Sequence, residues 1–258
     1  MAIHPTAVID PDAEISREAE VGPYCIVGSG VSIAARTRLI AHVYLEGKLT
    51  IGKDNLFYPY CSVGVTPQDK KYKGEPSETR IGDRNTIREF VTINRGTEGG
   101  GMVTSIGDGN LLMAYVHVAH DVLIHNHTII VNGVTFAGHV IVEDFANIGG
   151  LSAVHQYTRI GRYAIVGSRS VIKQNVLPFS ITASDHSVEV YGANKVGLER
   201  SGFPPDAIEP LQNAFRILTR AGLNTTQALA RIEEEIPLTA EVKELLEFIR
   251  TSQGGFVK

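Results

Sequence analysis

The sequence predicts a mainly β fold, a solenoid of short strands followed by a C-terminal α-helical domain. Two observations predict it. A large apolar residue recurs at every sixth position through most of the chain, and this register fails beyond Val176, where the pattern turns helical from about Pro204. We therefore expect a β domain over residues 1–190 and a helical domain over residues 191–258.

The six-residue repeat is interrupted only twice. All its apolar positions except Phe57 and Phe136 are Ile, Leu or Val, and the residue four positions further on is mostly small or β-branched. Two inward-facing positions in every six residues predict short strands joined by tight corners. The apolar series runs through Ile3, Ile9, Ile15, Val21, Val27, Ile33, Leu39, Leu45, Ile51, Phe57 and Val63, then Ile81, Ile87 and Ile93, then Ile106, Leu112, Val118, Ile124, Ile130, Phe136, Val142, Ile148, Val154, Ile160, Val166 and Ile172.

This pattern resembles that of hexapeptide-repeat proteins. The resemblance implies a left-handed parallel β-helix with three hexads in each 18-residue coil. Its handedness follows from the resemblance alone, because ordinary parallel crossovers are right-handed. Stacked coils lie about 4.8 Å apart. Cys25 and Cys61 are two coils apart, too far for a disulfide, and we expect both to be small core residues.

Two polar segments interrupt the repeat and are expected to loop outward. The first, residues 66–80, contains two prolines; the second, residues 96–105, is glycine-rich and adds seven residues to the period. Long loops on a rigid scaffold usually serve function, although tolerated insertions are the alternative.

Three helices are expected in the C-terminal domain. Apolar residues share one face of the first, Asn224 or Thr225 can cap the second, and a third apolar stripe follows. These helices are expected to cover the open end of the solenoid or to pack against a neighbouring subunit. The face of the first helix contains Ile208, Leu211, Phe215 and Leu218, and that of the third contains Val242, Leu245, Leu246 and Ile249.

Composition excludes several classes of protein. The net charge of −4 argues against a nucleic-acid binder. No apolar run approaches the roughly 20 residues that cross a bilayer, so no membrane insertion is expected. The amino terminus lacks the pattern of a secretory signal, which favours a cytoplasmic location.

Histidines cluster between residues 117 and 155. In the predicted register His120, His139 and His155 gather near one edge on three successive coils. A neutral imidazole can take a proton from a hydroxyl that attacks an acyl group. Asp121 could orient His120, but neighbours in a strand point to opposite faces, so their contact requires a corner. Gly138 is either an oxyanion donor through its N–H or simply a corner residue.

Direct transfer between two bound substrates is the expected reaction course. The sequence contains no nucleophile elbow, and no cysteine lies near the histidines, which argues against a covalent acyl-enzyme.

An ordered set of motifs resembles one family over essentially the whole chain, the UDP-N-acetylglucosamine O-acyltransferases that begin lipid A biosynthesis. The motifs are QDKKYKGEP, IREFVTINRGT, NLLMAYVHVAHD, FAGHV, GGLSAVHQY and GLERSGF. The resemblance implies transfer of a 3-hydroxyacyl chain from acyl carrier protein to UDP-N-acetylglucosamine, in a homotrimer with sites between subunits and without a cofactor or metal.

The family's site residues carry over to positions of this chain. The resemblance implies that His120 deprotonates the sugar 3-hydroxyl, that Asp121 is its dyad partner and that the Gly138 N–H binds the oxyanion. Asp69 and Lys71 would reach the site from the first loop, across the trimer interface. The other residues implied to bind the nucleotide sugar or the acyl carrier are His117, His139, His155, Gln156, His186, Asn194 and Arg200.

Some positions bear on specificity. Ser168 lies where the family places a chain-length determinant, and its small side chain predicts an acyl chain longer than about ten carbons. Asn94 replaces the usual histidine, so an imidazole's role there is lost. Ser201 follows Arg200 where a second basic residue is common, and the pair at 184–185 is Ser-Asp in place of Gly-Asn.

Other functions compete with this interpretation. A γ-type carbonic anhydrase-like zinc enzyme could use His120 and His125 as ligands. The related N-acyltransferase of the same pathway has an additional amino-terminal domain, whereas the repeats here begin at Ile3. A non-catalytic solenoid would need neither the histidines nor the loops. The sequence leaves open whether the acceptor carries a 3-hydroxyl or a 3-amino group.

Overall fold

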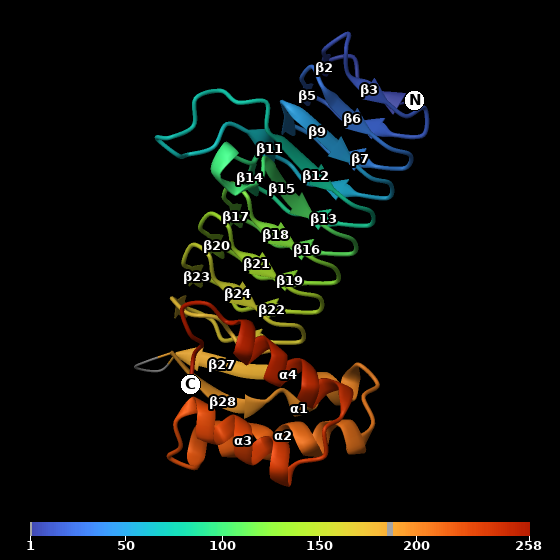
Figure 1. The fold of residues 1–258 in the computed structure, drawn as a ribbon. Helices are drawn as coiled ribbons and strands as arrows, with labels where there is room; N and C mark the ends of the chain where they lie inside the picture. The colour runs from blue at the N-terminus through green and yellow to red at the C-terminus, as the bar shows by residue number, and fades with distance from the viewer. Residues whose placement is uncertain (1, 185–187) are drawn as a thin grey trace.

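In the part of the chain that the structure describes, a left-handed parallel β-helix is followed by four α-helices (Figure 1). The computed structural model describes residues 2–184 and 188–258. His186, predicted to bind substrate, lies outside the described residues. In the described part of the chain, no helix is long and apolar enough to cross a membrane.

Three sheets form the faces of the solenoid; their strand pairs are parallel except for the last pair of the 11-stranded sheet, which is antiparallel. The 11-stranded sheet contains β1 (Ala2–Ile3), β4 (Glu20–Val21), β7 (Arg38–Leu39), β10 (Leu56–Phe57), β13 (Thr86–Ile87), β16 (Leu111–Leu112), β19 (Ile129–Ile130), β22 (Asn147–Ile148), β25 (Ile165–Val166), β27 (Ser180–Ser184) and β28 (Val188–Ala193). The 9-stranded sheet contains β2 (Val8–Ile9), β5 (Ile26–Val27), β8 (Tyr44–Leu45), β11 (Ser62–Val65), β14 (Thr92–Asn94), β17 (His117–Val118), β20 (Thr135–Phe136), β23 (Ala153–Val154) and β26 (Val171–Ile172). The 8-stranded sheet contains β3 (Glu14–Ile15), β6 (Val31–Ile33), β9 (Lys48–Ile51), β12 (Glu78–Ile81), β15 (Val103–Ile106), β18 (Leu123–Ile124), β21 (Ile141–Val142) and β24 (Arg159–Ile160).

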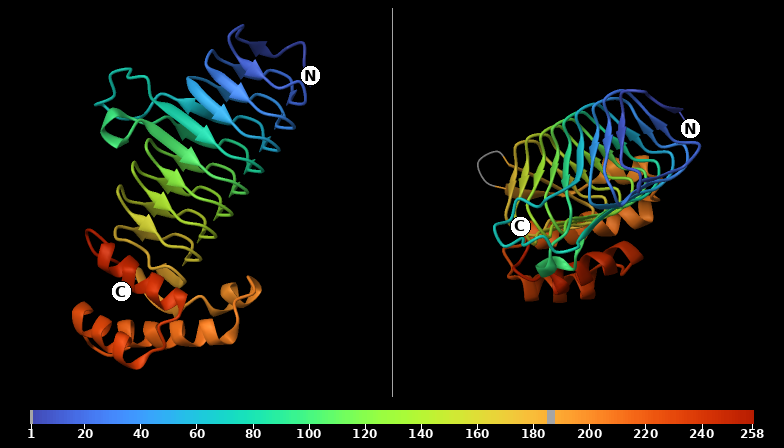
Figure 2. Two further views of the ribbon diagram at one scale, coloured as in Figure 1. Left: turned by 45° about the vertical axis from the view of Figure 1, so that its right-hand side comes forward. Right: turned by 90° about the horizontal axis from the view of Figure 1, so that it is seen from above.

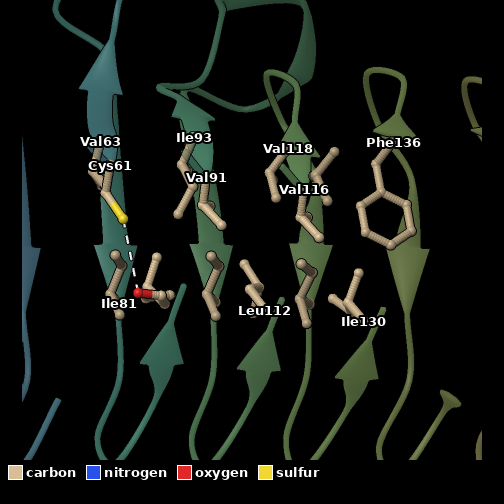
Figure 3. Close-up of a cluster of buried hydrophobic side chains, with 14 of the residues drawn as sticks. Cys61, Val63, Ile81, Val91, Ile93, Leu112, Val116, Val118, Ile130 and Phe136 are labelled. Atoms are coloured by element: carbon tan, nitrogen blue, oxygen red, sulfur yellow. Dashed lines mark hydrogen bonds between the residues drawn. The ribbon is translucent and has the colours of Figure 1, made fainter. Parts of the chain in front are cut away.

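The apolar repeat forms the core. From Val21 onward its residues are buried, and Figure 3 shows some of them, among them Val63, Val118 and Phe136, stacked coil upon coil. Ile3, Ile9 and Ile15 are only partly buried, because the first coil has a neighbour on one side alone. Cys25 and Cys61 are free and buried, as expected, and burial raises the pKa of the Cys61 thiol to about 12.

Three kinds of corner join the sheets. We call the corner between the 9- and 8-stranded sheets the site corner; it includes residues 119–122, 137–140 and 155–158. The ladder corner joins the 11- and 9-stranded sheets and contains a stack of exposed rings. The amide corner joins the 8- and 11-stranded sheets and contains buried Asn and Thr side chains. The stacked rings belong to Tyr24, His42, Tyr60, Phe90 and Tyr115, and the amide-corner side chains to Thr37, Asn55, Asn85, Asn110 and Thr128.

Both predicted loops leave the solenoid at the site corner and project from the same side in Figure 2. The first loop covers residues 66–77 and the second residues 95–102, where a single 3-10 turn (Glu98–Gly100) forms. Each loop is shorter than expected, because Glu78–Ile81 pairs with Lys48–Ile51 on one side and with Val103–Ile106 on the other. The loop ends therefore join the sheet as strand residues.

The helices are α1 (Lys195–Arg200), α2 (Pro205–Arg220), α3 (Thr225–Glu235) and α4 (Ala240–Thr251). The apolar faces predicted for α2 and α4 are buried, and Asn224 caps α3 as expected. Short α1 was not predicted. The main core cluster ends at Val176 and a second begins at Leu177, whereas the boundary predicted at residue 190 falls inside β28. The division into two domains stays a prediction.

Candidate active site

The site corner stacks polar side chains from three successive coils. His117 pairs with Thr135 and Thr135 with Ala153, so the predicted 18-residue register holds through this region. Consequently His120, Gly138 and Gln156 share one corner position, and Asp121, His139 and Tyr157 share the next. The register places His155 one position earlier, on the third coil.

His120 and Asp121 contact each other although they are adjacent in sequence. His120 Nδ1 lies 2.8 Å from Asp121 Oδ2. The contact is possible because Asp121 has a left-handed backbone with φ +59°, which ends the strand alternation at the corner. The Asp121 side chain is 1% exposed and that of His120 is 16% exposed. A buried carboxylate therefore orients an imidazole that opens to solvent.

The second loop surrounds Asp121. Thr97 donates from its backbone N to Asp121 Oδ1 at 2.8 Å and from its hydroxyl to Oδ2 at 2.5 Å. The Asp121 backbone N donates to Thr104 Oγ1 at 2.8 Å. A Cβ added at Gly100 would lie 2.0 Å from Asp121 Cγ. Loop and carboxylate are thus in close contact.

Gly138 lies beneath the His120 ring. A Cβ at this position would lie 2.5 Å from His120 Cε1 and 2.8 Å from Nε2, so a side chain would displace the imidazole. Within the described ranges 2–184 and 188–258, no acceptor takes the Gly138 N–H. An unpaired N–H close to His120 Nε2 can donate to an oxyanion formed there.

His139 extends the site toward a cleft. Its ring meets that of His120 edge-on at 5.1 Å and stacks on Tyr157 at 4.5 Å. Burial lowers the pKa of His139, while Asp121 and Asp69 oppose this shift. The cleft has a volume of about 440 Å³, and its lining residues are Asp69, Lys71, Tyr72, Lys73, Glu75, Thr97, Glu98, Gly99, His139 and Tyr157. The first loop therefore reaches the cleft of its own chain.

The remaining predicted residues near this corner face outward. His117, in β17, has Nδ1 2.8 Å from Thr92 Oγ1, and burial lowers its pKa. His155 and Gln156 are exposed, and His155 Nδ1 lies 3.2 Å from the Gln156 carbonyl oxygen. The exposed His155 and Gln156 side chains are accessible to a ligand at the site corner, whereas His117 is partly buried.

Other predicted residues lie elsewhere. Ser168 is exposed at the ladder corner, away from His120. Asn194 is buried and caps α1, accepting from Gly197 N at 3.0 Å and donating to the Tyr163 carbonyl oxygen at 3.0 Å. Arg200 is exposed at the end of α1. A single chain does not bring these three to the histidines.

Asn94 is buried where the family usually has histidine. Its Nδ2 donates to the Thr66 carbonyl oxygen at 3.1 Å, at the start of the first loop, and its Oδ1 has no hydrogen-bond partner in the described part of the chain. The amide thus anchors the loop and leaves one polar atom unsatisfied.

One group of metal-ligating side chains occurs among the described residues: His120, Asp121 and His139, with donor atoms within 4.8 Å of one another. The Asp121 oxygens already accept hydrogen bonds from Thr97 and His120. His125 follows β18 and lies at the amide corner, so the His120–His125 pair of the zinc alternative is not brought together. The geometry favours acid–base chemistry over metal binding at Asp121.

Two contacts of the site were not singled out from the sequence. Tyr157 follows His139 by 18 residues, so the same register argument could have found it. Thr97 lies in the inserted loop, where the repeat gives no register, and no signal in the sequence places it on Asp121.

Known proteins resemble the chain over its full length. The family model described as UDP N-acetylglucosamine O-acyltransferase, domain 2, matches residues 175–257, and the bacterial transferase hexapeptide model matches residues 104–138. The acyl-[acyl-carrier-protein]–UDP-N-acetylglucosamine O-acyltransferase of Thermodesulfovibrio yellowstonii is 49% identical over 256 residues, 99% of each chain. The enzyme of that name from Xylella fastidiosa is 43% identical over 99% of this chain and 97% of its own.

Solved structures agree with these sequence relationships. LpxA from Acinetobacter baumannii superposes with a TM-score of 0.95 at 37% identity, covering 100% of both chains. The UDP-N-acetylglucosamine acyltransferase of Bacteroides fragilis superposes with a TM-score of 0.96 at 38% identity, covering 99% of this chain and 100% of that one. The similarity includes both the β-helix and the C-terminal helices.

Proposed function

The chain belongs to the family of acyl-[acyl-carrier-protein]–UDP-N-acetylglucosamine O-acyltransferases, and from this premise we propose that it transfers a 3-hydroxyacyl chain from acyl carrier protein to the 3-hydroxyl of UDP-N-acetylglucosamine. The chain is an acyltransferase. The proposed product is the 3-O-acyl sugar nucleotide with which lipid A synthesis begins.

His120 acts as the general base. Because Nδ1 faces Asp121, Nε2 is the nitrogen available to the sugar hydroxyl. The hydroxyl gives its proton to Nε2 as its oxygen attacks the thioester carbonyl carbon, and Asp121 stabilises the imidazolium that forms. The Gly138 N–H donates to the carbonyl oxygen as it becomes negative.

Collapse of the tetrahedral intermediate completes the reaction. The carbon–sulfur bond breaks, the pantetheine thiolate leaves, and the imidazolium returns the proton to sulfur. The oxygen–carbon bond formed in the first step remains as the ester. No side chain becomes acylated, so the transfer is direct. The observation that most strongly supports this mechanism is the 2.8 Å contact between His120 Nδ1 and the buried Asp121 carboxylate.

The surrounding residues are proposed to bind the two substrates. Asp69, Lys71 and His139 line the cleft beside the dyad, and the exposed His155 and Gln156 extend it along the next coil. Arg200 is exposed and can donate two parallel hydrogen bonds to a phosphate. Asn194 contributes indirectly, because its amide is engaged in capping α1.

The proposed assembly is a homotrimer whose sites lie between subunits. Ser168 lies at a different corner from His120, so a role in measuring the acyl chain requires a second copy of the chain. The exposed aromatic rings of the ladder corner supply an apolar surface for such contacts. The cytoplasmic location expected from the sequence stays a prediction.

The test is transfer of a labelled 3-hydroxyacyl group from acyl carrier protein to UDP-N-acetylglucosamine. The native chain should form the ester, and His120→Ala should lose roughly 10²- to 10⁴-fold in kcat while keeping its circular dichroism and melting temperature. An active His120→Ala would refute the base. Transfer only to the 3-amino analogue would replace the proposed acceptor, and transfer to neither would refute the function.

A further inference from the structure

The second loop supplies the contacts that fix the orientation of Asp121. The Asp121 carboxylate is held by three donors: the Thr97 backbone N, the Thr97 hydroxyl and His120 Nδ1. Two of the three come from one residue of this loop. Thr97 is itself buried, at 5% exposure, so solvent cannot easily replace its hydrogen bonds.

The loop is folded around this interaction. The Thr97 carbonyl oxygen accepts from Gly100 N at 3.1 Å and from Met102 N at 2.9 Å, which closes the turn. Thr97 occupies the N-cap position of the 3-10 turn, yet its side chain makes no capping hydrogen bond there. Its hydroxyl instead donates to Asp121 Oδ2.

Gly100 completes the enclosure. A Cβ built on Gly100 would lie 2.0 Å from Cγ and 2.2 Å from Oδ2 of Asp121, far closer than any real contact. Gly100 is therefore needed for the carboxylate to sit where it meets His120. By contrast, a Cβ on the preceding Gly99 would meet no atom within 4 Å.

We propose that the second loop is a positioning element for catalysis, in which Thr97 holds the Asp121 carboxylate in line with His120 Nδ1 and Gly100 provides the space for it. The inference rests on the proposed function, because it assigns the loop to the general base of that reaction. Thr97 touches Asp121 and acts on the reacting atoms only through it. The seven residues added to this coil thereby gain a role.

Two variants of Thr97 distinguish the effect of its hydroxyl from an effect on folding. Thr97→Val removes one donor to Asp121 at nearly constant volume and should lower kcat roughly 10- to 100-fold, the value of a hydrogen bond to a charged group. KM should stay within about twofold, because the loss falls on the transition state. Thr97→Ser keeps the hydroxyl and should retain most of the native kcat.

A matched control for the loss of a hydroxyl is available in the chain. Thr79 is fully buried, and its hydroxyl has no hydrogen-bond partner in the described part of the chain, so Thr79→Val makes the same chemical change without loss of a contact. Gly100→Ala forces a methyl group into Asp121. Thr79→Val should keep the native kcat, and Gly100→Ala should lose at least as much as Thr97→Val.

A spectroscopic measurement keeps this inference separate from the identity of the substrate. In protein labelled with [15N]histidine, the His120 signals, assigned by their absence in His120→Ala, report which ring nitrogen holds the proton. The native protein should hold it on Nδ1, toward Asp121, and Thr97→Val should give a mixture of tautomers. This readout applies even if the native chain transfers no acyl group, an outcome that would overturn the proposed function alone.

Two results would overturn the positioning role. One is a Thr97→Val protein with native kcat and an unchanged His120 tautomer. The other is equal loss of activity in Thr97→Val and Thr97→Ser, since both would then reflect packing and not the hydroxyl.

Discussion

At the scale of single residues, the two nitrogens of the His120 imidazole differ: Nδ1 makes a hydrogen bond, and Nε2 has no hydrogen-bond partner among the residues that the structure describes. Nδ1 lies against Asp121, while the Nε2 edge lies over Gly138. Asp121 Oδ1 accepts from Thr97 N, and Oδ2 accepts from the Thr97 hydroxyl and His120. Both oxygens of the carboxylate thus act as hydrogen-bond acceptors, as an ionised acid allows.

Asp121→Asn should therefore disrupt catalysis while preserving shape. In either orientation of the new side-chain amide, its nitrogen would face the Thr97 N–H or the His120 Nδ1–H. One hydrogen-bond donor would then point at another. The charge that stabilises the imidazolium is also lost, and we expect kcat to fall roughly a thousandfold or more. Steady-state kinetics check this, with the melting temperature as the folding control; a variant within tenfold of native kcat would contradict the dyad.

Burial of His117 predicts a dependence of stability on pH. Burial lowers the pKa of His117, because it disfavours the protonated ring. As the pH falls through the ordinary histidine value of about 6.5, the unfolded chain binds a proton that the folded chain does not. Stability is therefore full above that value and declines below it. His139, whose pKa is lowered mainly by burial, contributes in the same direction.

Urea denaturation at about pH 8 and about pH 5.5 measures this effect. The midpoint should fall at the lower pH, and His117→Gln should reduce that fall. Thr92→Val removes the hydrogen-bond partner of His117 but keeps the ring, so it should retain the pH dependence. An equal fall in native protein and His117→Gln would contradict the assignment.

The residues at the site corner could be predicted to the extent that the repeat gives them a position. Counting 18 residues from His120 gives Gly138 and Gln156, and the structure places all three at one corner position. The sequence predicts contact between His120 and Asp121 only if the chain turns a corner there, and the left-handed Asp121 backbone, with φ +59°, forms that corner. Thr97 could not be found, because a loop residue's contacts depend on how the loop folds.

At the scale of elements, the amide corner joins successive coils through a buried ladder of side chains. Asn85 Nδ2 donates to Asn55 Oδ1 at 3.0 Å and to the Gly107 carbonyl oxygen at 2.8 Å. Asn85 Oδ1 accepts from the backbone N of Asn110 at 2.9 Å and from its Nδ2 at 3.0 Å. The same pattern continues to Thr128, so each amide satisfies backbone groups that the tight corner leaves unpaired.

Asn85→Ala should destabilise the β-helix strongly. It leaves the buried Asn110 N–H and the half-buried Gly107 carbonyl without these partners, at about 1–3 kcal/mol for each group. We expect a loss of about 2–4 kcal/mol in the free energy of unfolding, measured by urea denaturation. Thr79→Val, which loses no hydrogen bond, should change it little; similar losses in both variants would refute the role of the ladder.

Elements with a strong period were predicted well, and those held by tertiary contacts were not. The hexads predicted the strands, the apolar faces predicted α2 and α4, and a possible N-cap at Asn224 or Thr225 predicted α3. Short α1 escaped because its six residues contain one buried apolar side chain and its stability depends on the Asn194 cap. Residues 78–80 were assigned to a loop because their sequence is polar, but pairing on both sides makes them a strand.

At the scale of the whole molecule, the three corners divide the work. The site corner has His120, His139, His155 and both loops, the amide corner joins successive coils through hydrogen bonds, and the ladder corner presents a column of rings spaced about 5.0 Å apart. Several of these rings are more than half exposed, including Tyr24, Tyr60 and Tyr115. Ser168 lies further along the same corner. If Ser168 limits the length of the acyl chain bound at His120, the ladder corner of one copy must meet the site corner of another.

Two simple measurements bear on this arrangement. The mass in solution should be three times the 28.0 kDa of one chain. Ser168→Met should shift the preferred acyl group to a shorter one by at least about tenfold in relative kcat/KM, because the larger side chain occupies space that the end of a long chain needs. A monomer, or an unchanged preference in Ser168→Met, would refute the corresponding part of the assembly.

Mixed trimers decide which chain supplies Ser168. Subunits with His120→Ala are inactive but retain Ser168, whereas subunits with Ser168→Met retain His120. If the neighbour supplies residue 168, the active His120 of a Ser168→Met subunit is paired with the native Ser168 of an adjacent His120→Ala subunit. An excess of the His120→Ala subunit should then restore the preference for the long acyl chain. If each chain supplies its own, the preference of the mixture stays short at every ratio. The first result requires site and ladder corners to meet between copies, and the second excludes it.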